Sequence, residues 1–217
     1  MVTLSDEALA RRLPVWDALS ELFLDTETRW YLPRVAGVLA QSGYSPEELE
    51  RIWRWEISPE CAFNLLAVAG EWAAMPYSVE ALARRAASRT FHLRDFIAAA
   101  PARRLLQPTW KALLALRALL VPLEPAERSQ RVAVWGALLH AYLERSLDKL
   151  LFIDRELATL RQSGLTAEEL ERLFETELRP RVKGLLVGDE RRDEERRAVN
   201  VRELISRAFL GGVAGAS

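Results

Sequence analysis

Three acidic residues, Asp25, Glu27 and Glu71, are the candidates for metal chemistry in this sequence. They lie at the ends of two predicted helices, and those helix ends could meet in the fold. Carboxylate oxygens are the ligands that Mg²⁺ and Mn²⁺ favour, so the three could serve a metal-dependent enzyme. The alternative is capping, because Asp25 can cap a following helix and Glu27 is favoured near its positive end. We prefer capping and predict no cofactor.

The two histidines, His92 and His140, have no Ser, Cys or Asp partner at the spacing of a catalytic triad. With the single Cys61 they also form no His/Cys set at zinc-ligand spacing. We therefore predict that both histidines are structural or surface residues and that no residue is catalytic. Cys61 is predicted to be a small buried apolar residue.

Trp53 and Trp55 flank Arg54 in an unusually aromatic front half of the chain. Because they are two residues apart, the tryptophans cannot share one face of a helix, and one of them should be exposed. Trp and Arg dominate the binding energy of many protein interfaces, which favours a protein-binding role for Trp53, Arg54 and Trp55. Core packing against a neighbouring helix is the alternative.

Charge is unevenly distributed along the chain, although the net charge is only −1. Residues 1–78 hold six Lys/Arg against twelve Asp/Glu, whereas residues 79–117 hold eight against two. The basic segment could face nucleic acid. The residues that would do so are Arg84, Arg85, Arg103 and Arg104. We prefer the alternative that the segment lies against the acidic front or faces solvent, because these arginines lack Gly- or aromatic-rich surroundings.

Two segments of the sequence recur in the same order. Leu39–Trp53 and Leu160–Phe174 are identical at nine of fifteen positions, and Val15–Asp25 and Val134–Glu144 at five of eleven. The sequence therefore predicts two tandem related helical units, packed as a pseudo-symmetric bundle. Trp16 and Trp135 should then be equivalent buried residues.

The longer repeat is predicted to be a turn between two helices. Gly43 and Gly164 can end a helix in the left-handed conformation that only glycine adopts without strain. Ser45 and Thr166 can begin the next helix with a capping box, because each has a glutamate three residues later. Both copies should form the same turn.

The fold class is predicted to be all-α, because no segment shows the period-two alternation of a strand. Prolines at 59 and 108 are predicted to lie between helices. Apolar residues at three- and four-residue spacing predict helices over 13–24, 28–41, 46–57, 61–72, 79–89, 93–99, 110–120 and 199–210, and a helix pair or one bent helix over 126–163.

Three segments follow from these patterns: a first helical unit over 1–78, a basic connecting segment over 79–125 and a divergent second unit over 126–217. No Gly/Ser-rich linker separates them, so we expect them to pack together. The composition, 50% hydrophobic and 28% charged, is typical of a globular protein. With neither a signal peptide nor an apolar run of membrane-spanning length, a cytoplasmic location is predicted.

Part of the first unit resembles a family of small bacterial helical proteins of unknown function. The matching runs are LPVWDALSELFLDTE from residue 13, GYSPEELERI from residue 43 and NLLAVAGEW from residue 64. The resemblance covers roughly residues 13–77 and implies a helical fold and a bacterial source. It implies no activity. The second copy departs from the pattern, since Gly136 stands where Asp17 does, so we expect it to have lost any function of the motif.

The predicted function is that of a non-enzymatic helical protein that binds another protein, as an adaptor or an immunity-type inhibitor of a bacterial toxin. It rests on the lack of convergent chemistry in the sequence, the helical repeats and the charge separation. One alternative is a nucleic-acid-associated regulator or defence protein using residues 79–117. The other is a metal-dependent enzyme using the three acidic residues. No membrane partner is predicted.

Overall fold

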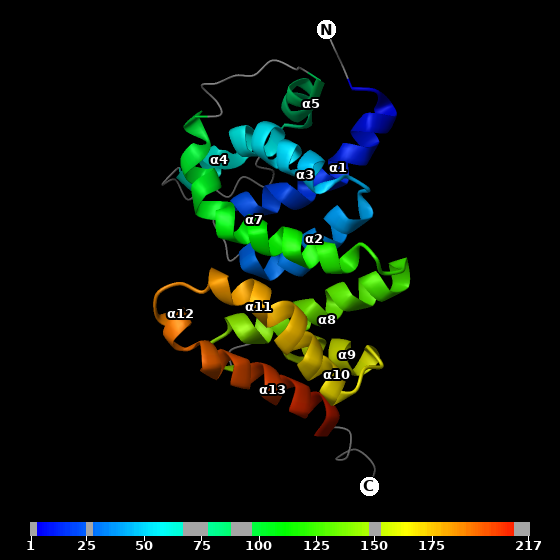
Figure 1. Ribbon diagram of the computed structural model, residues 1–217, viewed down its shortest axis with the longest axis vertical. Helices are drawn as coiled ribbons and strands as arrows, with labels where there is room; N and C mark the ends of the chain where they lie inside the picture. Colours follow the sequence, from blue (N-terminus) through cyan, green and yellow to red (C-terminus); the bar gives the residue numbers. More distant parts are fainter. Residues whose placement is uncertain (1–3, 25–27, 67–77, 88–96, 148–152, 211–217) are drawn as a thin grey trace.

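The computed structural model describes residues 4–24, 28–66, 78–87, 97–147 and 153–210 (Figure 1). The all-α prediction is confirmed, because none of these residues lies in a strand. Within the described ranges, none of the helices combines the length and the apolar character that crossing a membrane requires.

The first part of the chain consists of α-helices joined by short 3₁₀ and π turns. Its elements are α1 (Asp6–Ser20), the 3₁₀ turns η1 (Glu21–Phe23) and η2 (Thr28–Tyr31), α2 (Leu32–Gln41), α3 (Pro46–Arg51), the π-helix η3 (Ile52–Ile57), α4 (Ser58–Leu66), α5 (Val79–Ala87) and α7 (Ala100–Leu120).

The second part also consists of α-helices joined by short 3₁₀ and π turns. Its elements are α8 (Pro125–Leu143), α9 (Ile153–Gln162), α10 (Ala167–Leu173), the π-helix η5 (Phe174–Leu178), α11 (Arg179–Val182), the 3₁₀ turn η6 (Lys183–Leu185), α12 (Asp189–Arg192) and α13 (Glu194–Leu210). The stretch predicted as a helix pair or one bent helix is thus a pair, α8 and α9.

The repeated turn has the same conformation in both copies. Gly43 and Gly164 both have φ of 71°, the left-handed region in which a side chain is strained. Ser45 and Thr166 each begin a helix with a complete capping box. The predicted helix ends and starts are therefore confirmed at all four positions.

Pro59 does not end a helix, contrary to the prediction. Ser58 is helical, with φ −57° and ψ −42°, and α3, η3 and α4 follow one another without a break. The Ser58 N–H donates to the carbonyl of Trp53, five residues back, and its hydroxyl donates to the same oxygen at 2.6 Å. This wide π turn gives room to the proline ring, which clashes with the preceding turn of an α-helix. Pro180 likewise follows a π-helix, η5.

The first helix begins at Asp6, seven residues before the predicted start at Leu13. The Ser5 hydroxyl accepts from the N–H of Ala8 at 3.2 Å, and acidic residues occupy the first turn. Pro14, predicted to open the helix, lies inside it. Local capping by Ser5, which lies outside the predicted helix, thus determines where α1 begins.

Two other helices also extend beyond their predicted bounds. α7 contains Pro108 and begins well before the predicted Trp110. A proline inside a helix costs about 3 kcal/mol, but the extensive packing of α7 on α2 outweighs that cost. α13 begins at Glu194 rather than at Val199, and together with α12 it makes most of the mixed-charge run Asp189–Arg197 helical. The predicted short helix over 93–99 lies mostly outside the described residues.

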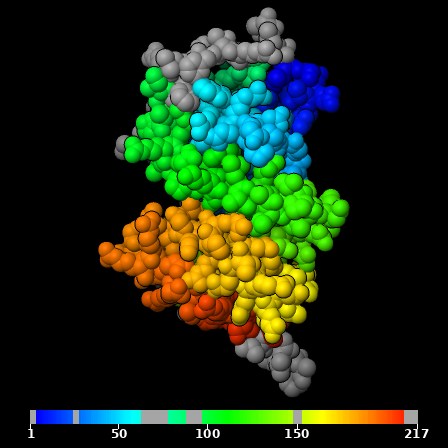
Figure 2. All heavy atoms as spheres, in the orientation of Figure 1, coloured from blue at the N-terminus to red at the C-terminus, as the bar shows by residue number. Residues whose placement is uncertain are grey.

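One hydrophobic core extends through both parts of the chain. Trp16 and Trp135 are both 0% exposed, which confirms that each is buried. Trp53 stacks on Trp110 with ring centroids 4.6 Å apart. α2 packs on α7 on one side and on α8 on the other, so it joins the two parts. Figure 2 shows the chain as adjoining layers, with the blue-to-green elements as far as α8 above and the yellow-to-red elements from α9 onward below.

An ion pair links the two parts at their boundary. Arg29 of η2 donates to both carboxylate oxygens of Glu190 in α12, at 2.7 and 3.0 Å, and also to the carbonyl of Leu185. Both side chains are shielded, at 15% and 19% exposed. A bidentate pair with so little solvent contact fixes orientation as well as distance.

Each part also contains an arginine–glutamate pair at matching positions. Arg12 lies 3.2 Å from Glu56, and Arg131 lies 2.6 Å from Glu177. In the first pair the carboxylate also accepts from the indole N–H of Trp16 at 2.8 Å. Burial raises the pKa of Glu56, although Arg12 and Trp16 act in the opposite direction. Among the described residues, the buried indole N–H of Trp135 has no such partner.

This difference predicts unequal effects of the same substitution at the two tryptophans. Trp16→Phe removes a hydrogen bond to a buried carboxylate, whereas Trp135→Phe removes none to a described residue. We expect the free energy of unfolding to fall by about 1.5–3 kcal/mol more for Trp16→Phe, the usual size of a hydrogen bond to a charged group. Guanidinium denaturation followed by circular dichroism measures both. Equal losses would contradict this assignment.

Candidate functional site

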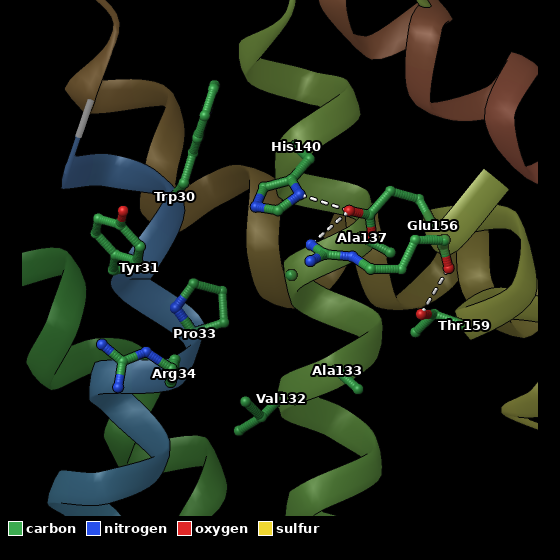
Figure 3. A pocket seen from close by; sticks show the side chains of 12 residues that line it. Trp30, Tyr31, Pro33, Arg34, Val132, Ala133, Ala137, His140, Glu156 and Thr159 are labelled. Atoms are coloured by element: carbon green, nitrogen blue, oxygen red, sulfur yellow. Dashed lines mark hydrogen bonds and ion pairs between the residues drawn. The ribbon is translucent and has the colours of Figure 1, made fainter. Parts of the chain in front are cut away.

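A pocket of about 410 Å³ lies where η2 and α2 of the first part meet α8 and α9 of the second (Figure 3). Because residues of both parts line it, the pocket exists only when the two parts are packed together. The residues that determine its chemistry are Trp30, Tyr31, Arg34, His140, Arg155 and Glu156.

The space in the pocket arises from short side chains on α8. Where α2 and α8 touch, a Cβ atom added to Gly37 would lie only 2.9 Å from a methyl group of Val132. One turn further along α8, a Cβ atom on Gly136 would meet no atom of the described residues within 4 Å. Ala133 and Ala137 also line the pocket. The helices are therefore in contact at Gly37 and leave a hollow beside Gly136.

A buried carboxylate forms the polar centre of the site. Glu156 is 2% exposed, and its Oε1 lies 2.7 Å from His140 Nδ1 and 3.0 Å from Arg155 Nη2. Burial acts to raise the pKa of Glu156, but the hydrogen bonds and charges of His140 and Arg155 outweigh burial and hold the pKa below 4.5. Glu156 is therefore ionised at neutral pH and can only accept, so His140 carries a proton on Nδ1.

The imidazole is held in a defined orientation by its neighbours. Its Nδ1 edge is directed to Glu156, and the opposite edge, with Nε2, faces the α2 side of the pocket (Figure 3). The ring of Trp30 is tilted by 58° against it, with centroids 5.5 Å apart. The buried indole N–H of Trp30 has no hydrogen-bond partner within the described ranges. His140 is thus a pocket residue, and its predicted structural or surface role stays a prediction.

Two arginines lie at the rim of the pocket. The Arg34 guanidinium forms an ion pair with Glu21 and lies 5.8 Å from the ring centroid of Tyr31. Arg155 pairs with Glu156. The side chains of Arg34 and Arg155 are 53% and 63% exposed, so both are within reach of solvent and of a bound molecule.

The sequence interpretation missed Arg155 and Glu156, although a signal was present. Arg34 and Arg155 each stand five residues before the longer repeated stretch. Glu21 and His140 likewise occupy the same place in the shorter repeat. In the first copy the arginine pairs with Glu21, whereas in the second copy histidine replaces that glutamate, and both the histidine and the arginine contact Glu156. Comparing the copies position by position would have located the site.

The three residues predicted to bind a protein, Trp53, Arg54 and Trp55, separate into core and surface residues. Trp53 is 0% exposed, whereas Trp55 is 38% exposed, as expected for two residues that cannot share a helix face. Arg54 pairs with Glu50, which also accepts from the indole N–H of Trp110. Trp53 therefore supports this face from inside, and only Trp55 and Arg54 can touch a partner.

The basic residues also differ in accessibility. Arg85 lies 3.2 Å from Glu60, and Arg103 is 8% exposed. Burial lowers the pKa of Arg103, and the nearby charge of Arg54 lowers it further. Arg84 and Arg104 are exposed. Two of the four arginines named for nucleic acid thus face solvent.

For the predicted metal ligands and His92 the structure gives no geometry. Asp25, Glu27, Glu71 and His92 lie outside the described residues. Among the residues that the structure describes, no three His, Cys, Asp or Glu side chains are grouped closely enough to hold a metal ion. Cys61 is fully buried, and burial raises its thiol pKa to about 12, which confirms its predicted role as a small buried residue.

Comparison with known protein families gives a match over the first half of the chain. Residues 10–116 match a family described as a domain of unknown function (DUF7079), so this region is similar to an uncharacterised family, as its sequence pattern indicated. The match includes Trp30 and Arg34 but ends before His140 and Glu156. No curated protein and no solved structure matches the chain.

The lowered pKa of Glu156 predicts a pH-dependent contribution to stability. Its ionised form stabilises the fold above the ordinary pKa of 4.5, and this contribution is lost as pH falls through the lower folded-state value. The difference in unfolding free energy between the native chain and Glu156→Gln should therefore shrink as pH falls from about 6 to about 3. Urea denaturation across this range measures it.

The exposed Glu168 provides the matched control. Glu168→Gln should change stability little at any of these pH values, because its carboxylate is in contact with water. His140→Phe should lower the free energy of unfolding at neutral pH, since it removes a hydrogen-bond donor from a buried carboxylate. A pH-independent difference for Glu156→Gln would show that Glu156 is not held ionised by its neighbours.

Proposed function

We propose that this chain is a non-enzymatic protein that binds another protein through the face around Trp55, as an adaptor or an immunity-type inhibitor. The observation that carries the proposal is the 38% exposure of this tryptophan on the outer side of η3. Tryptophan and arginine are enriched among the residues that supply most of the binding energy of protein interfaces. Arg54 and the exposed Arg51 stand close to Trp55 in the same helical segment.

The surroundings of Trp55 support this proposal because they are rigid. Trp53, two residues before Trp55, is stacked on Trp110. Glu56, the residue after Trp55, is 4% exposed and lies in the buried cluster with Arg12. A side chain presented from such a fixed backbone loses little conformational entropy on binding. With Arg51 and Arg54 beside the indole, the complementary partner surface is an apolar recess with an acidic rim.

The two alternatives have less support. Nucleic-acid binding by residues 79–117 rests on Arg84 and Arg104, because Arg85 contacts Glu60 and Arg103 is buried. If this alternative holds, Arg84→Ala and Arg104→Ala should each reduce the salt dependence of DNA or RNA binding by about one charge. The metal-dependent enzyme depends on acidic residues outside the described ranges and stays a sequence-based hypothesis.

The interaction proposal predicts a strong effect of one substitution. Trp55→Ala should weaken binding to the natural partner by about 30-fold or more, the loss of about 2 kcal/mol that defines a dominant interface residue. The partner is first isolated from the cells that naturally make this chain. Calorimetry with the two purified proteins then gives the dissociation constant.

Val121 provides the control for this measurement, because it is an apolar residue, 46% exposed, at the end of α7. Val121→Ala should bind like the native chain. Recovery of no partner at a one-to-one ratio, or equal binding by Trp55→Ala, would contradict the proposal.

A further inference from the structure

The pocket between the two parts has the size of a small-molecule site. Its volume of about 410 Å³ lies in the range of roughly 300–1,000 Å³ found for ligand pockets. Gly136, Ala133 and Ala137 leave this space along α8, Figure 3 shows Pro33 facing it from the opposite wall, and Tyr31 also lines it. A hollow that side chains of both parts surround, and that neither helix fills, can admit a compact organic molecule.

The walls of the pocket favour a flat apolar body. Trp30 and Tyr31 supply aromatic surface on the α2 side. The His140 ring, tilted against Trp30, adds a further flat edge. Opposite them, the small residues of α8 offer room without polar side chains. Aromatic rings pack well against such a combination of faces and edges.

The polar groups of the pocket favour a negative charge on the ligand. The ionisable lining residues are Tyr31, Arg34, His140, Arg155 and Glu156. The one carboxylate among them already accepts from both His140 and Arg155.

Each guanidinium has five N–H donors, and the side chains of Arg34 and Arg155 are 53% and 63% exposed. The lining therefore has more donors and positive charge than acceptors and negative charge.

We propose that this pocket binds a small organic anion, in which a carboxylate or phosphate group is attached to a flat apolar body. The anionic group lies toward Arg34 and Arg155 at the rim, and the flat body lies against Trp30 and Tyr31. The site goes beyond the interaction surface at Trp55, which is built from other elements. It also requires residues beyond the family match, because Arg155 and His140 follow residue 116.

The test uses the full ¹⁵N-labelled chain and three probes of one size: benzoate, phenyl phosphate and the neutral benzyl alcohol. The indole N–H signal of Trp30, assigned by its loss in Trp30→Phe, reports on the pocket. We expect one or both anions to shift this signal saturably and benzyl alcohol to bind at least tenfold more weakly. A response to benzoate alone identifies a carboxylate site, and a response to phenyl phosphate alone a phosphate site.

Substitutions then connect the signal to the pocket. Gly136→Leu should abolish the shift by filling the space, and Ala133→Leu serves the same purpose if the first variant does not fold. Arg34→Gln and Arg155→Gln should each raise the dissociation constant at least tenfold. Gly184→Leu is the matched control, because a side chain at Gly184 also meets no described residue within 4 Å, but Gly184 lies in η6 and does not line the pocket.

Three outcomes would overturn the proposal. The first is that neither anion gives a saturable shift. The second is that benzyl alcohol binds as tightly as the anions, which would make the site apolar rather than anion-binding. The third is that a folded Gly136→Leu or Ala133→Leu variant binds like the native chain. None of these results depends on a partner protein, so they are independent of the test at Trp55.

Discussion

The short helix α2 has to bury side chains on two sides at once, and the arrangement of the other helices depends on this constraint. Leu32, Val35, Ala36 and Leu39 are all 0% exposed within its ten residues. α7 covers it on one side and α8 on the other. Because Gly37 has no side chain, α8 can approach to direct contact. The boundary between the two parts of the chain is therefore part of the core rather than a separate interface.

Buried carboxylates organise the polar contacts around this core. Glu56 accepts from Arg12 and Trp16 inside the first part, and Glu156 accepts from His140 and Arg155 in the second. The physical balance differs between the two. Burial raises the pKa of Glu56, whereas hydrogen bonds and positive charge hold the pKa of Glu156 below its usual value. A carboxylate that is kept ionised at the wall of a pocket can orient an imidazole, whereas a carboxylate deep in the core mainly fixes the packing of its neighbours.

The sequence predicted features that depend on local chemistry. Gly43 and Ser45 specify a turn through φ and a capping hydrogen bond, and the repeat placed the same turn at Gly164 and Thr166. It failed where a change in helix geometry or tertiary packing offsets a local penalty. Pro59, for example, is accommodated by a π turn whose extra width is not visible in residue types.

The site could be predicted only in part, for the same reason. His140 and Trp55 stand out as residue types, but the pocket depends on how closely α2 approaches α8. Periodicity gives no measure of that distance between helices. The pairing of His140 with Glu156 joins α8 to α9, and a spacing of sixteen residues has no specific meaning until both helices are placed.

The contact between Gly37 and Val132 also bears on how such a chain can change over evolutionary time. A methyl group at position 37 would come within 2.9 Å of the valine, so alanine there becomes acceptable most readily when residue 132 shrinks. The two positions lie in different parts of the chain, and position 132 is beyond the end of the family match. In relatives that contain both parts, these positions should covary. In relatives that contain the first part alone, the glycine would be released from this constraint.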